Sequence, residues 1–265
     1  MPIPLTLLLS ALPALSNPAQ EDVAEVPSED LLAGGTEHMR YYLIGAGEDA
    51  KPPRKGYRLL LVLPGGDGSA NYHAFCKRIW KNSLSDEYLV AQLVAPRWSD
   101  DQFKSLVWPT EKKPWHAAMF TTEAFCEAVI ADVEERYELD LQHVFVLAWS
   151  SGGPATYAYA LRPDSRLTGA FVAMSVFRPG SLPSLKNAKG RAFYLLQSPE
   201  DTVTLYSLAE EAEKKLSKAK AEVELTSYTG GHGWKGDVFG NMRRGIAWLE
   251  KNHSKPPKRK KKKQK

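Results

Sequence analysis

Metal-binding patterns are missing from this sequence. Its 265 residues include only two cysteines and six histidines. No HExxH motif, closely spaced cysteine pair or histidine cluster occurs, and these are the patterns that hold zinc and related ions. We therefore expect neither a metal site nor a cofactor.

The scarcity of cysteine also limits cross-linking. Cys76 lies in the helix expected after the strand Tyr57–Leu63, and Cys126 lies in the helix expected before the strand Val144–Ala148. Right-handed crossovers that run in opposite directions from the centre of a sheet place their helices on opposite faces. The sulfur atoms would then be too far apart for a bond that needs Cα atoms ~5.5 Å apart. We expect two buried free thiols, and a disulfide stays the alternative.

The sequence has no apolar run of the ~20 residues that a membrane-spanning helix needs. The shorter apolar stretch Leu5–Leu15 is followed by small and polar residues, which is typical of a secretory signal with a cleavage site. We predict a signal peptide over residues 1–19 and export to the periplasm or the extracellular space. A disordered apolar leader is the alternative, because no Lys or Arg precedes the stretch. Residues 20–36 carry acidic but no basic side chains and are predicted to be a linker.

Positive charge is concentrated at the C-terminus. Lys255–Lys265 holds eight Lys and Arg residues and no acidic one, and without it the net charge falls from +4 to −4. Such a run binds polyanions electrostatically. Here no aromatic residues alternate with the charges and no nucleic-acid motif accompanies them. Residues 253–265 are therefore predicted to be a basic disordered tail, and nucleic acid is not an expected partner.

The remaining residues, 37–252, have the size of one α/β domain. The apolar fraction of 43% and the charged fraction of 25% are ordinary for a soluble globular protein. Runs typical of strands alternate with amphipathic helical ones, which indicates a mostly parallel central sheet flanked by helices on both faces. The expected strands are His38–Ile44, Tyr57–Leu63, Tyr88–Ala95, Val144–Ala148, Ala170–Ser175, Ala192–Gln197 and Val223–Tyr228. The expected helices are Asn71–Lys81, Thr122–Tyr137, Leu205–Ala219 and Phe239–Lys251.

A serine follows one of these strands at a sharp turn. The segment Val144–Gly153 passes from an apolar run into small residues around Ser150. Small residues two places before and after a serine permit the strand-to-helix turn that exposes a nucleophile, usually written G-x-S-x-G. Ala148 replaces the first glycine of that motif and Gly152 keeps the second. Taken alone, the segment also fits an ordinary turn between a strand and a helix.

An acid and a histidine follow in the order that a serine hydrolase built on a parallel sheet requires. Asp201 lies in the loop after the strand Ala192–Gln197, and His232 lies in a glycine-rich loop after the strand Val223–Tyr228. The chain order of serine, acid and histidine is the one known for such enzymes. We therefore predict that Ser150, Asp201 and His232 form a catalytic triad.

Two other residues stay open for these roles. Glu200 neighbours Asp201 and would be the acid if the loop were shifted by one residue. His116 would replace His232 as the base, because its loop follows the strand Tyr88–Ala95, whose C-terminal end faces the same edge of the sheet.

A glycine turn, Pro64–Ser69, follows the strand Tyr57–Leu63. Glycine bares backbone N–H groups, and the loop at this position supplies one of the two donors that hold an oxyanion in such hydrolases. We assign the donors to the backbone N–H groups of Gly66 and of Ser151, the residue after the serine. A plain glycine turn is the alternative.

The sequence resembles a known family in four segments, which read LVLPGGDGS, ERYELDLQHVFVLAWSSGG, LLQSPEDTV and YTGGHGW. They are similar to those of lidless α/β-hydrolase esterases, the carboxylesterase, feruloyl or acetyl esterase and polyhydroxybutyrate depolymerase-like group. The resemblance spans residues 38–251 and implies an α/β-hydrolase fold without a large cap domain. It also implies that Ser150 is the nucleophile, Asp201 the acid and His232 the base. Pro64 stands where the family usually has histidine, and Gln197-Ser198 replaces the common His-Gly.

Such a protein would cleave carboxylic esters through an acyl-enzyme intermediate. Only residues 176–191 separate two successive strands, too few for a cap domain, so we expect an open site for bulky or polymer-linked esters. Four tryptophans are predicted to bind substrate. Trp149 and Trp234 flank triad residues and would shape the acyl pocket, whereas Trp98 and Trp108 would either stack on the substrate or cover the core. A serine peptidase of the same fold and a non-catalytic binding protein are the alternative functions. We expect a monomer or a weak oligomer.

Overall fold

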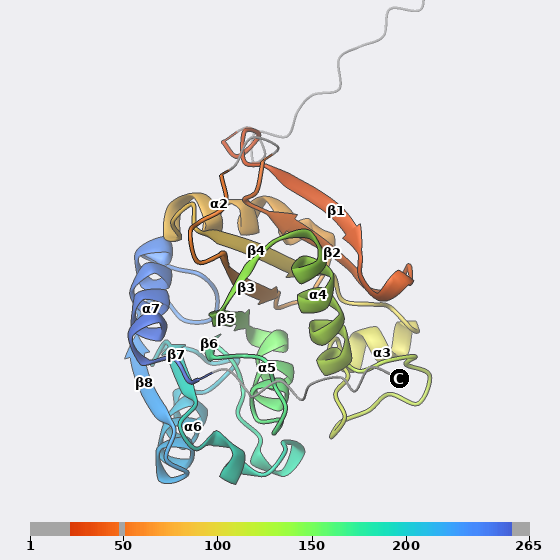
Figure 1. Ribbon diagram of the computed structural model, residues 1–265. Coiled ribbons are helices and arrows are strands. Elements are labelled where there is room, and N and C mark those ends of the chain that lie inside the picture. The colour runs from red at the N-terminus through yellow and green to blue at the C-terminus, as the bar shows by residue number, and fades with distance from the viewer. Residues whose placement is uncertain (1–21, 48–50, 256–265) are drawn as a thin grey trace, which may run out of the picture.

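An eight-stranded sheet runs through the part of the chain that the computed structural model describes, residues 22–47 and 51–255 (Figure 1). The strand order is β1-β2-β4-β3-β5-β6-β7-β8. Antiparallel pairing joins β1 to β2 and β2 to β4, and every other neighbouring pair is parallel. The strands are β1 (Ser28–Leu32), β2 (Arg40–Ile44), β3 (Tyr57–Leu63), β4 (Tyr88–Leu93), β5 (Leu139–Trp149), β6 (Gly169–Ala173), β7 (Ala192–Gln197) and β8 (Glu222–Ser227).

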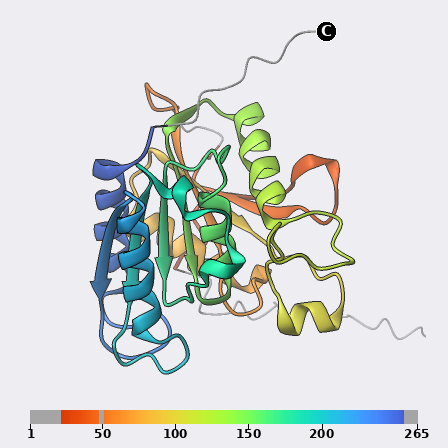
Figure 2. The same ribbon diagram turned by 90° about the horizontal axis from the view of Figure 1, so that it is seen from below.

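Helices cover both faces of the sheet, and Figure 2 shows α7 and α4 on opposite sides of it. The side chains of α2 and α7 pack into one apolar cluster, whereas those of α4, α5 and α6 pack into another. The helices are α2 (His73–Ser83), α3 (Asp100–Ser105), α4 (Thr122–Arg136), α5 (Gly153–Ala160), α6 (Tyr206–Lys218) and α7 (Val238–Asn252). The structure thus has the predicted architecture, a mostly parallel sheet between two layers of helices.

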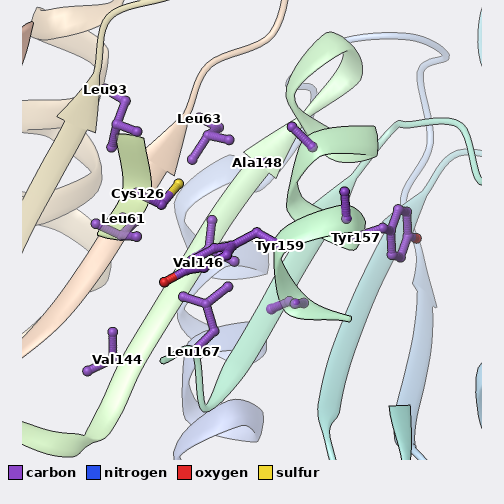
Figure 3. Packing of buried hydrophobic residues seen from close by; sticks show 14 of the residues in the cluster. Leu61, Leu63, Leu93, Cys126, Val144, Val146, Ala148, Tyr157, Tyr159 and Leu167 are labelled. Atoms are coloured by element: carbon purple, nitrogen blue, oxygen red, sulfur yellow. The ribbon is translucent and has the colours of Figure 1, made fainter. Parts of the chain in front are cut away.

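The two layers of core separate the cysteines, as predicted. Cys126 of α4 packs with Leu61, Leu63 and Val146 of the sheet (Figure 3). Cys76 of α2 belongs to the cluster on the other face. Both are buried and free. Burial raises the pKa of both thiols, so they stay protonated at neutral pH.

The parallel strands follow the predicted pattern closely, and β3 and β7 have the predicted bounds. The strand expected at Val144–Ala148 begins earlier, at Leu139, which pairs with Tyr57 of β3 across an irregularity in the register. Between β6 and β7 lie only two short 3-10 helices, Pro179–Ser181 and Leu185–Ala188. This connection is therefore a loop and not a cap domain.

The prediction of a linker over residues 20–36 is wrong for the part that the structure describes. Ser28–Leu32 forms the edge strand β1, and Val23 and Val26 are buried against the α2 side of the sheet. The acidic side chains that suggested a linker pair with basic ones of the domain. Asp22 lies 2.7 Å from Arg78, and Glu25 contacts Lys81 at 2.5 Å. Charge complementarity with α2 thus explains the acidic composition.

The predicted signal peptide, residues 1–19, lies outside the described residues. Residues 256–265 of the predicted tail lie outside them too. Within the described ranges, no helix is both long and apolar enough to cross a membrane.

Candidate active site

Ser150 stands at the turn between β5 and α5. Its φ of +49° is in the left-handed region, which only three non-glycine residues of the described chain adopt. A serine in this region is strained, and such strain is typical of a nucleophile elbow, where the turn lifts the hydroxyl above the sheet. The backbone of this turn therefore has the predicted form.

The turn tolerates Ala148 but requires Gly152. Ala148 is a regular strand residue that pairs with Leu63 and Val172, and its methyl group lies in the core. At Gly152, a Cβ atom would lie 2.3 Å from the Leu63 carbonyl oxygen. The departure from G-x-S-x-G thus falls at the position where a small side chain fits.

His232 faces Ser150 from the loop after β8. Its Nε2 lies 3.1 Å from the Ser150 Oγ, and its Nδ1 lies 2.8 Å from the Asp201 Oδ2. With the Nδ1 proton on the carboxylate side, Nε2 is free to accept the serine proton. The other histidine considered, His116, is exposed and packs beside Trp115. The structure therefore brings together Ser150, His232 and Asp201.

Asp201 is 3% exposed and is almost enclosed by hydrogen-bond donors. Its Oδ1 accepts from the backbone N–H groups of Val203 and Thr204, each at 2.8 Å. Its Oδ2 accepts from the Thr204 hydroxyl at 2.7 Å as well as from His232. Burial alone would raise the pKa of Asp201, but the bonds from Thr204 and His232 outweigh it and hold that pKa below its usual range. The carboxylate is thus ionised and oriented toward the imidazole.

Gln197 and Ser198, where the resembled family usually has His-Gly, both contribute to this site. The buried Gln197 amide donates to the Asp201 Oδ2 at 3.0 Å and to the Thr204 carbonyl at 2.6 Å. The Ser198 hydroxyl accepts from the N–H of Gly231, next to His232. The substitutions therefore supply hydrogen bonds of their own to the acid and histidine loops.

Glu200, the alternative acid, holds the histidine loop instead. Its Oε2 accepts from the N–H of Gly230 at 2.9 Å. Gly230, Gly231 and Gly233 all have positive φ, so the loop around His232 takes a path that glycine favours. Glu200 therefore acts on the backbone of the loop, and Asp201 is the carboxylate that contacts the imidazole.

The predicted oxyanion residues lie side by side. The Ser151 hydroxyl donates to the Gly66 carbonyl at 2.9 Å, which joins the loop after β3 to the start of the helix after Ser150. Gly66 has a φ of +59°, and a Cβ at Gly65 would lie 2.5 Å from the Trp149 ring. Ser151 is in the first turn of its helix, where a backbone N–H has no partner within the helix. The backbone N–H groups of Gly66 and Ser151 therefore lie on two segments that are in direct contact beside Ser150.

Pro64, at the start of this loop, takes part in a hydrogen bond through its carbonyl group. The indole Nε1 of Trp108 donates to the Pro64 carbonyl at 3.0 Å. Trp108 is 2% exposed, so this contact fixes the beginning of the glycine turn from the core side.

The other three tryptophans predicted to bind substrate are part of aromatic packing. Trp149 is 5% exposed, and its ring meets those of Tyr72, Phe75 and Trp234 edge-on at 5.5 to 5.7 Å. Trp98 packs against His38 and Phe120. For Trp98 these contacts correspond to the second of its two predicted roles, covering the core, and Trp149 has almost no exposed surface. Trp234 is only half-buried and follows His232 by two residues.

Sequence reasoning missed two hydroxyl groups of the site. The Ser175 hydroxyl donates to the Ser150 carbonyl at 2.6 Å, and the Thr204 hydroxyl donates to Asp201. Both residues follow strands of the parallel sheet at the end where Ser150 lies. Their position after these strands was the sequence feature that could have identified them.

A cavity of about 310 Å³ begins at Gly66 and Ser151. It extends between the segment 104–113 and the segment that follows β6. Its apolar walls are formed by Leu106, Val107, Trp108, Pro154, Val176 and Leu182. Part of an organic molecule can therefore be held beside Ser151, the residue after Ser150. Among the described residues, no group of three His, Cys, Asp or Glu side chains is arranged to hold a metal ion.

No protein-family model and no curated protein matches the sequence. Solved structures match in fold. A thermostable esterase is similar with a TM-score of 0.63 and 19% identity, over 88% of this chain and 64% of that one. MGS-M1, an α/β hydrolase enzyme from a Medee basin deep-sea metagenome library, is similar with a TM-score of 0.61 and 13% identity, over 85% of this chain and 97% of that one. Dipeptidyl peptidase 4 of Porphyromonas gingivalis is similar with a TM-score of 0.62 and 12% identity, over 86% of this chain and 35% of that one. The chain therefore has the α/β-hydrolase fold, which serves both esterases and a peptidase.

Proposed function

We propose that this protein is a serine hydrolase that cleaves carboxylic esters through an acyl-enzyme intermediate. The observation that carries the proposal is the continuous contact from the Ser150 Oγ through His232 to the Asp201 carboxylate, at 3.1 and 2.8 Å. Three separate strand ends supply these groups, so the contact depends on the whole fold. The similarity in fold to esterases supports the same reaction class.

In this mechanism His232 takes the proton of Ser150 as the Oγ attacks the ester carbonyl. The oxyanion that forms accepts hydrogen bonds from the backbone N–H groups of Gly66 and Ser151. Asp201 holds the Nδ1 proton of His232 and stabilises the imidazolium. His232 then gives its proton to the leaving alcohol, and water repeats the sequence on the acyl-enzyme to release the acid.

A fluorophosphonate probe tests the nucleophile. The wild-type protein should be labelled on one serine, and Ser150→Ala should not be labelled. Ser151→Ala is the matched control, because it removes the neighbouring hydroxyl while the backbone N–H stays in place. Labelling that persists in Ser150→Ala would exclude the proposed nucleophile. No labelling of the wild type would favour a non-catalytic binding protein on this scaffold.

The bond that is cleaved is tested with two matched series. We expect turnover of p-nitrophenyl esters and none above background of the p-nitroanilides with the same acyl groups. Ser150→Ala should lower kcat for the esters by at least ~10⁴-fold, since loss of a triad member removes the chemistry that the three groups perform together. Turnover of the anilides alone would establish the peptidase instead.

A further inference from the structure

The cavity beside Ser151 has a basic rim. Three cationic residues line it: Lys104 at the end of α3, Lys113 in the loop that follows α3, and Arg178 in the loop after β6. No Asp or Glu lines it. The rest of its lining is largely apolar and includes Gly66 and Ser151, next to the proposed nucleophile.

These cations are not neutralised within the described residues, 22–47 and 51–255. None of the three has a carboxylate within salt-bridge distance, although acidic residues are present in the same segment. Asp100 pairs with Arg97, and Glu111 pairs with Arg162 at 3.0 Å. Asp100 and Glu111 thus bind other basic side chains, and the three cations of the rim keep their charge available.

Buried polar contacts hold the segment that carries the two lysines. The Gln102 side chain is fully buried, accepts from the N–H of Trp98 and donates to the Leu106 carbonyl at 2.6 Å. Near Lys113, the Thr110 hydroxyl accepts from the Lys113 N–H, and the Thr110 N–H donates to the Lys113 carbonyl. The backbone at both lysines is therefore fixed next to the cavity.

We propose that the substrate of this site is an amphiphilic ester with an anionic group. The ester lies at Ser150, an apolar portion fills the cavity, and a carboxylate or similar anion reaches Lys104, Lys113 and Arg178. Like charges collected at a cavity without a counter-charge attract an oppositely charged ligand and repel a cationic one. This inference rests on the proposed esterase function, and it adds the class of substrate.

The anion is attached to either the acyl or the alcohol part, and two pairs of substrates distinguish these sources. The acyl pair is mono(p-nitrophenyl) adipate and p-nitrophenyl adipamate, which differ only in a terminal carboxylate or amide. The alcohol pair is acetoxyhexanoate and acetoxyhexanamide, and their hydrolysis is measured by the release of acetate. In one pair, we expect kcat/KM to be higher for the anionic ester by about fivefold or more at low salt, and the preference to fall in 1 M salt.

Charge removal tests the residues. In the triple variant Lys104→Met, Lys113→Met, Arg178→Met, the ratio of kcat/KM between anionic and neutral ester should fall at least about fivefold, toward one. The matched control is Lys112→Met, Lys186→Met, Lys214→Met, which removes the same net charge from exposed lysines that do not line the cavity. The control should keep the wild-type ratio. A ratio of one or less in the wild type for both pairs, or an unchanged ratio in the triple variant, would overturn the inference.

Binding separates this inference from the proposed reaction. In the Ser150→Ala background, two pairs of ligands are compared by calorimetric titration: phenyl adipate with phenyl adipamate for the acyl part, and acetoxyhexanoate with acetoxyhexanamide for the alcohol part. The anionic ligand of at least one pair should bind more tightly than its neutral partner, and the difference should vanish when the three cations are removed. If no ester is turned over but this difference is present, the esterase proposal fails and the anion site stands. If esters are turned over without any difference between the ligands, the anion site fails and the esterase stands. If neither is seen, both are wrong.

Discussion

The Ser175 hydroxyl donates a hydrogen bond of 2.6 Å to the backbone carbonyl of Ser150. The same carbonyl accepts from the N–H of Gly153, so two donors hold the strained turn from the side of β6 and from its own helix. Ser175 is 6% exposed and lies so close to the turn that a Cβ at Gly153 would overlap its Oγ. A side chain outside the triad therefore positions the proposed nucleophile.

Replacing Ser175 with Ala should lower both stability and turnover. One of two bonds to the Ser150 carbonyl is lost, which should cost about 0.5–1.5 kcal/mol of unfolding free energy. We expect kcat to fall about three- to tenfold with little change in KM, because the turn relaxes while the cavity stays intact. Ser165→Ala is the control, since Ser165 is equally buried but precedes β6 at the far end. A kcat that drops equally in both variants would argue against positioning.

Asp201 and Glu200 should respond very differently to loss of charge. Asp201→Asn places an amide where His232 needs an acceptor, and we expect kcat to fall by about 10³–10⁴-fold, as is general for this kind of triad. Glu200→Gln should lower kcat by less than about threefold, because its carbonyl oxygen can still accept from the N–H of Gly230. Steady-state kinetics on one p-nitrophenyl ester compares the two. Equal losses would mean that the acid had been assigned to the wrong neighbour.

The acid stability of the protein should depend on Asp201. Its pKa is lowered in the folded protein, so its ionised form stabilises the fold above the unfolded-state pKa of about 3.9. This contribution is lost as the pH falls through the folded pKa. The difference in unfolding free energy between the wild type and Asp201→Asn should therefore be full at about pH 6 and shrink below about pH 4. Urea unfolding at both pH values measures it, and a difference that does not change with pH would refute the assignment.

Much of the fold was predictable because buried parallel strands leave a strong sequence signal. Tyr57–Leu63 and Ala192–Gln197 are largely apolar runs, and both have the predicted bounds. Ser28–Leu32 has no such signal, since most of its residues are exposed at the edge of the sheet and two of them are acidic. An edge strand is held by main-chain pairing with β2, which the composition of the strand does not reveal.

The grouping of Ser150, Asp201 and His232 followed from chain order, because C-terminal ends of parallel strands meet at one edge of a sheet. Their supports were not predictable in the same way. The contacts of Gln197 and Ser175 depend on which way a side chain points from a neighbouring strand or loop. The basic rim of the cavity was also missed, because its residues come from α3 and two loops, and the sequence does not show that these segments lie together.

The N-terminal segment that precedes β1 should contribute to stability, contrary to the prediction of a linker. Val26 is 3% exposed and packs in the cluster that includes Cys76 and Ile79. Val26→Ala removes two buried carbon groups, which should lower the unfolding free energy by about 1.6 kcal/mol at ~0.8 kcal/mol for each. Ala24→Gly nearby is the control, because Ala24 is exposed. Equal stability of Val26→Ala and the wild type in urea would restore the linker interpretation.

The separation of Cys76 and Cys126 on opposite faces of the sheet makes a prediction about thiol chemistry. Both thiols are fully buried, and burial raises their pKa values, so little thiolate is exposed to react. A disulfide reagent such as Ellman's should find no reactive thiol in the native protein and two after unfolding, with or without prior reduction. The rate of labelling should follow unfolding, because each sulfur becomes accessible only when its layer of the core opens. Two thiols that appear only after reduction would instead show a disulfide, which these two helices cannot form while the sheet lies between them.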